Sequence, residues 1–279
     1  MERRLDGLRD QPRPGAPARI KPACKVRVVA LACSKPTDGS NHWTITRLAG
    51  KTGLSRATVH RILNEGRLKP HKVHYWCGRS PDPEFEPKQA AILGLYLSPP
   101  ENALVLSVDE KTQMQALERT QPELPMRPGD PRRQTATYKR HGTVCLLAAL
   151  AVHSGEVAGR CVEHNNHYEF LKFLKYLYRK YRHKQLHIIV DNLKVHQHQD
   201  VMTWAAKRRR LTFHFTPTYA SWLNQIEIWF NIFTRDVIRG GAWSSRAELA
   251  AQIIRYIRVY SRERAHPFRW TYTGKPLAA

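Results

Sequence analysis

The feature that most constrains the fold is an alternation of short apolar runs and amphipathic stretches between residues 104 and 260. The short apolar runs predict buried strands over 104–108, 113–117, 143–152, 186–190 and 211–215. Stretches with apolar side chains at helical spacing are expected as helices over 168–181, 200–210 and 220–239. A last helix opens at Ser245, which forms a capping box with Glu248. This alternation predicts an α/β domain, a mixed sheet with flanking helices.

Two of the apolar strands end in an aspartate. Val108 is followed by Asp109, and Val190 is followed by Asp191. Functional groups of α/β sheets gather beyond the carboxyl ends of strands, and carboxylates brought together there repel each other unless a cation lies between them. Mg²⁺ prefers oxygen ligands of this kind. Each aspartate alone is more simply explained as a turn cap, but the pair in one context favours a metal site.

A third acid, Glu227, stands in the apolar segment 221–230. A carboxylate beside a core-facing helix surface is costly unless it is paired or bound to a metal. An arginine partner is the alternative, because the chain carries 46 Lys and Arg against 23 Asp and Glu. The net charge of +23 itself favours nucleic acid as a partner.

The first 80 residues carry a net charge of +12 and a helix-turn-helix pattern. Thr44 and Ser55 are placed to cap two short helices, and Gly53 makes the turn between them. Val59, Ile62 and Leu63 share the apolar face of the second helix. The candidate DNA-binding residues lie at its start or on its other face: Ser55, Arg56, Ala57, His60 and Arg61. A helical hairpin with a solvated basic face is the alternative.

Three blocks in this order resemble the catalytic blocks of bacterial insertion-sequence transposases of the mariner-related DDE superfamily: Val108–Lys111, Ile189–Asn192 and Thr216–Glu227. Asp191 and Glu227 are separated by 35 residues, which is similar to the family spacing. Tyr138–Gly142 and His266–Trp270 also resemble that family.

The resemblance implies a ribonuclease-H-like fold in which Asp109, Asp191 and Glu227 are the catalytic and metal-binding triad. It implies Mg²⁺, with Mn²⁺ as a substitute, and a two-metal cleavage at element ends followed by strand transfer into target DNA. The expected partners are double-stranded DNA, as terminal inverted repeats and a TA-containing target, and a second copy of the chain in an end-paired homodimer. The expected location is the bacterial cytoplasm, at the nucleoid. No membrane association is expected, because the longest apolar run, Val144–Val152, has nine residues.

The expected organisation is a basic Pro-rich linker over 1–22, the helix-turn-helix module over 23–80, a linker over 81–102, the catalytic domain over 103–270 and a tail over 271–279. Compared with the family, the chain looks shortened at its N-terminus. A non-catalytic DNA-binding remnant is therefore the alternative function, followed by a structure-specific nuclease. The histidine pairs 164/167 and 196/198 lack a cysteine at zinc-finger spacing, so solvated or DNA-facing roles are expected for them.

Overall fold

The structure is a computed structural model that describes residues 20–72 and 80–270. It divides into two units, Met1–Cys77 and Gly78–Ala279, which are described separately. Most of the expected linker 1–22, and all of the expected tail 271–279, lie outside the described residues. Within those residues, no helix combines the length and the hydropathy that a membrane crossing requires.

In its described part, the first unit contains the helices α2 (Pro22–Cys33), α3 (Ile45–Thr52) and α4 (Arg56–Glu65). The predicted caps are confirmed: the Thr44 side chain accepts from the Arg47 N–H, and the Ser55 side chain accepts from the Thr58 N–H. Gly53 ends α3 with a φ of 71°, a left-handed conformation that favours glycine. The helices share a small core of Val28, Trp43, Leu48, Val59, Ile62 and Leu63. α2, which the sequence pattern did not indicate, supplies Val28.

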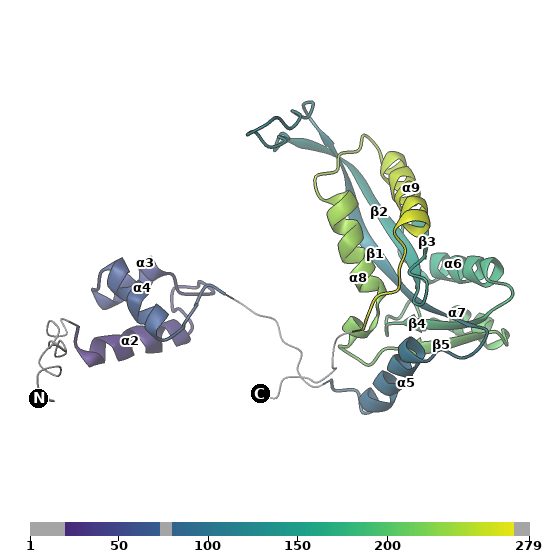
Figure 1. The fold of residues 1–279 in the computed structure, drawn as a ribbon, viewed down its shortest axis with the longest axis horizontal. Coiled ribbons are helices and arrows are strands. Elements are labelled where there is room, and N and C mark those ends of the chain that lie inside the picture. The colour runs from purple at the N-terminus through teal and green to yellow at the C-terminus, as the bar shows by residue number, and fades with distance from the viewer. Residues whose placement is uncertain (1–19, 73–79, 271–279) are drawn as a thin grey trace, which may run out of the picture. The chain divides into compact units, whose positions relative to one another are not determined.

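The second unit is built on a five-stranded sheet in the order β3-β2-β1-β4-β5 (Figure 1). The strands are β1 (Ala103–Arg119), β2 (Tyr138–Ala151), β3 (Val157–Val162), β4 (Gln185–Val190) and β5 (Leu211–Phe215). β1, β2 and β3 pair antiparallel, whereas β4 runs parallel to β1 and β5 parallel to β4. The predicted mixed sheet is confirmed. The two strands expected over 104–108 and 113–117 are one strand, whose register shifts between Lys111 and Met114.

Helices cover both faces of the sheet. α6 (His167–Lys180) and α7 (Gln199–Ala206) pack on the face that presents Leu106 and Val108. α8 (Ile226–Phe233) and α9 (Arg246–Glu263) pack on the face that presents Leu146 and Ala148. Since successive strand residues point to opposite faces, the two cores are separated by one layer of backbone.

The segment 81–102, expected to be a linker, contains α5 (Phe85–Leu97). Ile92, Leu95 and Tyr96 of α5 are buried against Val105 and Ile189 of the sheet, so the segment belongs to the core of the second unit. Its prolines suggested an extended chain, but Pro87 stands in the first turn of α5. A missing N–H costs no helical hydrogen bond there.

The single helix expected over 220–239 is three shorter pieces: a 3₁₀ turn (Ser221–Leu223), α8, and a π-helical turn (Thr234–Ile238). The interruption before α8 falls at Asn224, which is buried and donates two hydrogen bonds to Val108 and Asp109 within β1. These bonds hold residue 224 in an extended conformation, with ψ of 103°, that an α-helix does not allow.

Candidate active site

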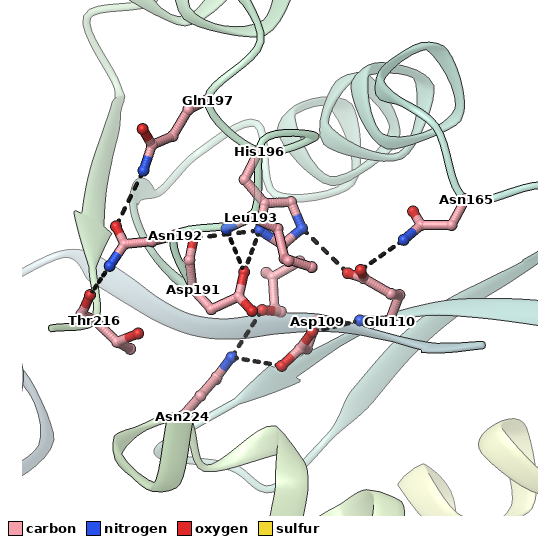
Figure 2. Close-up of polar contacts among 11 residues, drawn as sticks. Asp109, Glu110, Asn165, Asp191, Asn192, Leu193, His196, Gln197, Thr216 and Asn224 are labelled. Carbon is pink, nitrogen blue, oxygen red and sulfur yellow. Dashed lines mark hydrogen bonds and ion pairs between the residues drawn. The ribbon is translucent and has the colours of Figure 1, made fainter. Parts of the chain in front are cut away.

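The register of two neighbouring strands brings two of the predicted acids together. Ser107 of β1 pairs with Ile189 of β4, and two residues further along each chain stand Asp109 and Asp191. Successive residues of a strand point to opposite faces of the sheet. Val108 and Val190 face α6 and α7, so Asp109 and Asp191 point to the other face. Asp109 and Asp191 therefore lie side by side at the carboxyl edge of β4, as Figure 2 shows.

Asp109 is buried, with 6% of its surface exposed. The Asn224 side-chain amide donates to one carboxylate oxygen at 3.2 Å, and the backbone N–H of Glu110 donates to the other at 2.8 Å. Burial, followed by the negative charges of Glu110, Asp191 and Glu227, raises the pKa of Asp109 to about 8. In the absence of a cation this carboxyl is therefore largely protonated at neutral pH.

Asp191 has a different environment because two donors engage one of its carboxylate oxygens. The backbone N–H of Leu193 donates to its Oδ1 at 3.0 Å, and the same oxygen lies 2.8 Å from His196 Nδ1. Burial opposes ionisation, but the hydrogen bonds from His196 and Leu193 outweigh it and lower the pKa of Asp191. Asp191 is thus held as a carboxylate in one orientation.

His196 bridges two acids and is fully buried (Figure 2). Its Nε2 lies 3.1 Å from Glu110, whose other carboxylate oxygen accepts from the Asn165 amide at 2.6 Å. Burial acts against its protonation, yet the hydrogen bonds to Asp191 and Glu110 raise the pKa of His196 to about 10. The solvated or DNA-facing role expected for His196 is therefore wrong. Its position five residues after Asp191, in the loop that follows a buried strand, was the available signal.

Glu227 lies in the first turn of α8 and is exposed. Partial desolvation raises its pKa, Lys111 lowers it, and the charges of Asp191 and Glu110 raise it further, so that the net shift is upward. Glu227 in turn contributes to the raised pKa of Asp109. The three predicted acids, from β1, β4 and α8, are thus within electrostatic range of one another.

This donor set fits a hard divalent cation. Carboxylate oxygens predominate, and two of the three acids have raised pKa values that a bound cation would lower. Two further oxygens at the start of α8, Asn224 Oδ1 and Gln225 Oε1, are buried without a hydrogen-bond partner among the described residues. Unpaired buried oxygens of this kind are expected beside a cation or its water shell.

The family model of the DDE superfamily endonuclease matches residues 105–250, which is more than half of the chain and includes all three acids. The chain belongs to the DDE superfamily endonucleases. A second family model, the homeodomain-like domain, matches residues 1–63. The resemblance to this superfamily, made from the sequence blocks, is confirmed.

The DDE endonuclease is also similar to individual proteins. It is 27% identical over 116 residues to the "Insertion element IS630 uncharacterized 39 kDa protein" of Shigella sonnei, a match that spans 40% of this chain and 34% of that relative. Its fold is similar to that of the Mos1 mariner paired end complex with Mn, with a TM-score of 0.59 and 16% identity over 92% of this chain and 77% of that one. For the Mos1 strand transfer complex the TM-score is again 0.59, with 16% identity over 94% of this chain and 77% of that one. The expected fold class is confirmed by these likenesses.

In the homeodomain-like unit of the endonuclease, the five candidate DNA-binding residues are all exposed. The hydroxyl of Ser55 caps α4 by accepting from Thr58, while Arg56, Ala57, His60 and Arg61 project from the helix surface that does not face the small core. Thr58, between them in sequence, is buried. The surface is therefore free for a ligand, and its contact with DNA stays a prediction.

In the structure, one histidine from each of the two sequence pairs, His167 and His198, forms a new pair. His167 of α6 stacks on His198, with ring centroids 3.6 Å apart, and the exposed Asp200 lies beside both rings. His198 is the N-cap of α7, because its Nδ1 accepts from the Asp200 N–H at 3.3 Å. We assign this group to capping, since one ring nitrogen is already engaged by the helix.

Proposed function

We propose that this DDE endonuclease is a DNA transposase in which Asp109, Asp191 and Glu227 are the catalytic, metal-binding triad. The observation that supports the proposal is that Asp109 and Asp191 stand side by side beyond the paired stretch of β1 and β4, with Glu227 of α8 close enough for its charge to contribute to the raised pKa of the buried Asp109 carboxyl. Acids that repel one another in this way are costly without a positive charge between them, and a bound cation would remove that cost. The similar proteins named for an insertion element and for a strand transfer complex support the same function.

Mg²⁺, with Mn²⁺ as a substitute, is the proposed cofactor. When bound, divalent cations activate the attacking water or 3′-hydroxyl and stabilise the leaving oxygen of the phosphodiester. The chain's own residues prepare the ligands: Asn224 orients the Asp109 carboxylate, and the Leu193 N–H orients that of Asp191. Glu227 completes the set from α8. The Mos1 complex described with Mn supports a divalent ion at a site on this fold.

The proposed substrate is double-stranded DNA: the terminal inverted repeats of the element, then a TA-containing target. The homeodomain-like unit would hold the DNA through Arg56, His60 and Arg61, while the second unit cuts it. We further propose a homodimer in the end-paired complex, working on nucleoid DNA in a bacterial cytoplasm. The net charge of +23 supports binding to a polyanion.

The test is strand cleavage of a duplex that carries the element's own ends, with Mg²⁺, Mn²⁺ or EDTA. Asp191→Asn is compared with Asp200→Asn, a matched change at an exposed carboxylate of α7. We expect metal-dependent cuts at the ends from the unchanged chain and from Asp200→Asn, and none from Asp191→Asn. Cutting that survives in EDTA or in Asp191→Asn would contradict the proposed triad. Tight binding by all three proteins with no cutting would favour a non-catalytic remnant.

A further inference from the structure

A basic groove lies between α6 and α7, outside the acidic site. Its cations are Lys175, Arg179, Lys207, Arg208 and Arg209, and the open volume is about 820 Å³. Lys175 and Arg179 stand one helical turn apart on α6, whereas the other three follow α7 directly. Two parts of the chain that are about 30 residues apart in sequence thus contribute positive charge to one hollow.

The five cations of the basic groove have no acidic partner among residues 20–72 and 80–270. Within the described part of the chain, none of them forms an ion pair with a carboxylate. The acid of α6, Glu169, pairs with Lys172 and Arg160 at the other end of the helix. Like charges gathered in this way repel one another, and an anionic ligand removes that repulsion. The charge pattern therefore indicates a polyanion.

Aromatic side chains fix the shape of the basic groove. The Arg208 guanidinium lies over the Trp204 ring at 5.2 Å, and Tyr178 meets the same ring edge-on at 5.8 Å. Arg210 lies over Tyr178 at 4.1 Å and donates to three carbonyls at the end of α6 and in the following turn. Because Trp204 is engaged by both neighbours, the groove offers cations for phosphates and no free ring for stacking a base. This favours duplex DNA over a single strand.

The basic groove is distant from the acidic site. Asn165, just before α6, bonds Glu110, so the amino end of α6 is at the catalytic edge of the sheet. Lys175 and Arg179 follow the start of α6 by 8 and 12 residues, or about 12–18 Å along the helix axis. Lys207–Arg209 precede β5, whereas Thr216, which accepts from Asn192 beside the acids, follows it. The five residues of β5 span about 16 Å, so the groove and the acids open at opposite edges.

We propose that the basic groove binds the sugar-phosphate backbone of a second stretch of duplex DNA, apart from the stretch that is cut. The inference rests on the proposed function only in taking DNA as the ligand. Contacts to phosphate give affinity without sequence preference and make it steeply dependent on salt. The groove would thus hold flanking or target DNA against the second unit while the acids act elsewhere.

The test compares two variants of the full chain that lose the same charge. Lys175→Gln/Arg179→Gln/Arg209→Gln removes three exposed groove cations. Arg246→Gln/Arg255→Gln/Arg262→Gln removes three from α9 across the sheet, where Glu163 and Glu263 already pair Arg246 and Arg262. Binding of a 30-base-pair duplex of arbitrary sequence is measured by fluorescence anisotropy from 50 to 200 mM NaCl, with no divalent metal.

We expect the groove variant to lose roughly tenfold in duplex affinity and about 2–3 in the slope of log K against log salt, near 0.9 for each lost phosphate contact. The α9 variant should stay within about twofold of the unchanged chain, because two of its three cations already have carboxylate partners and release few counterions. Equal losses in both variants would overturn the proposal. A larger loss for a single-stranded oligonucleotide than for the duplex would overturn the assignment to duplex DNA. The readout is binding without metal, so a failure of the cleavage test leaves this comparison intact.

Discussion

Replacing Asp109 with Asn should stabilise the protein in EDTA, and more so as the pH rises. The pKa of Asp109 is raised to about 8 in the folded chain, against an ordinary value of 3.8. The folded state therefore binds more protons than the unfolded state between these two values, and its stability falls with rising pH. Each pH unit corresponds to about 1.4 kcal/mol, so the full interval corresponds to roughly 4–6 kcal/mol. The side-chain amide of the variant does not ionise, so the variant escapes this loss.

The assay is urea unfolding followed by tryptophan fluorescence in EDTA at pH 5, 6, 7 and 8. The quantity compared is the difference in unfolding free energy between Asp109→Asn and the unchanged chain, which cancels the titration of groups that do not interact with Asp109. We expect this difference to grow by roughly 1 kcal/mol or more per pH unit, and to shrink when Mg²⁺ replaces EDTA, since a bound cation stabilises the ionised carboxylate. Asp200→Asn, at an exposed position, should show no such growth. A difference for Asp109→Asn that is constant from pH 5 to 8 would refute the reasoning.

Three further predictions concern individual contacts. His196→Gln should weaken Mn²⁺ binding by about 10–100-fold, because Asp191 and Glu110 lose their shared donor. The affinity is measured by electron paramagnetic resonance titration. An unchanged affinity would show that His196 does not position Asp191. Gly155→Ala should lower the free energy of unfolding by about 2 kcal/mol or more, since φ is +75° and a Cβ would lie 2.0 Å from the His266 carbonyl oxygen; an unchanged urea midpoint would contradict this. Ser55→Ala should cost about 1 kcal/mol of the first unit's stability, seen as faster amide exchange at Thr58, and protection equal to that of the unchanged chain would argue against the cap.

Much of the local structure was predictable from short-range patterns. The caps at Thr44, Ser55 and Ser245, and the strand over 211–215, depend on residues within one turn or one strand of each other. The same holds for Asp191, which directly follows β4, because a buried strand requires an unbroken apolar run. In each of these cases, residues close together in the sequence are enough to predict the local structure. Asp109 was also expected at a strand end, but β1 continues to Arg119, so Asp109 lies within the strand.

Other features were decided by contacts between distant segments. Proline residues made 81–102 look like a linker, yet burial of Ile92 against the sheet made it a helix. Asn224 interrupted a segment of helical pattern because its amide donates to the Val108 carbonyl within β1, more than 100 residues earlier. His196 looked like one of many polar loop residues until the fold placed it between Asp191 and Glu110.

The sequence by itself singled out the acids that we propose carry the chemistry, because a carboxylate directly after an apolar run is unusual wherever the chain goes. Only the tertiary structure decided the protonation state of those residues. The raised pKa of Asp109 and the lowered pKa of Asp191 arise from burial, from shared hydrogen bonds and from charges on other strands. The joining of α6 and α7 cations into one groove also required the fold, since electrostatic interactions depend on distance through space and not on separation along the chain.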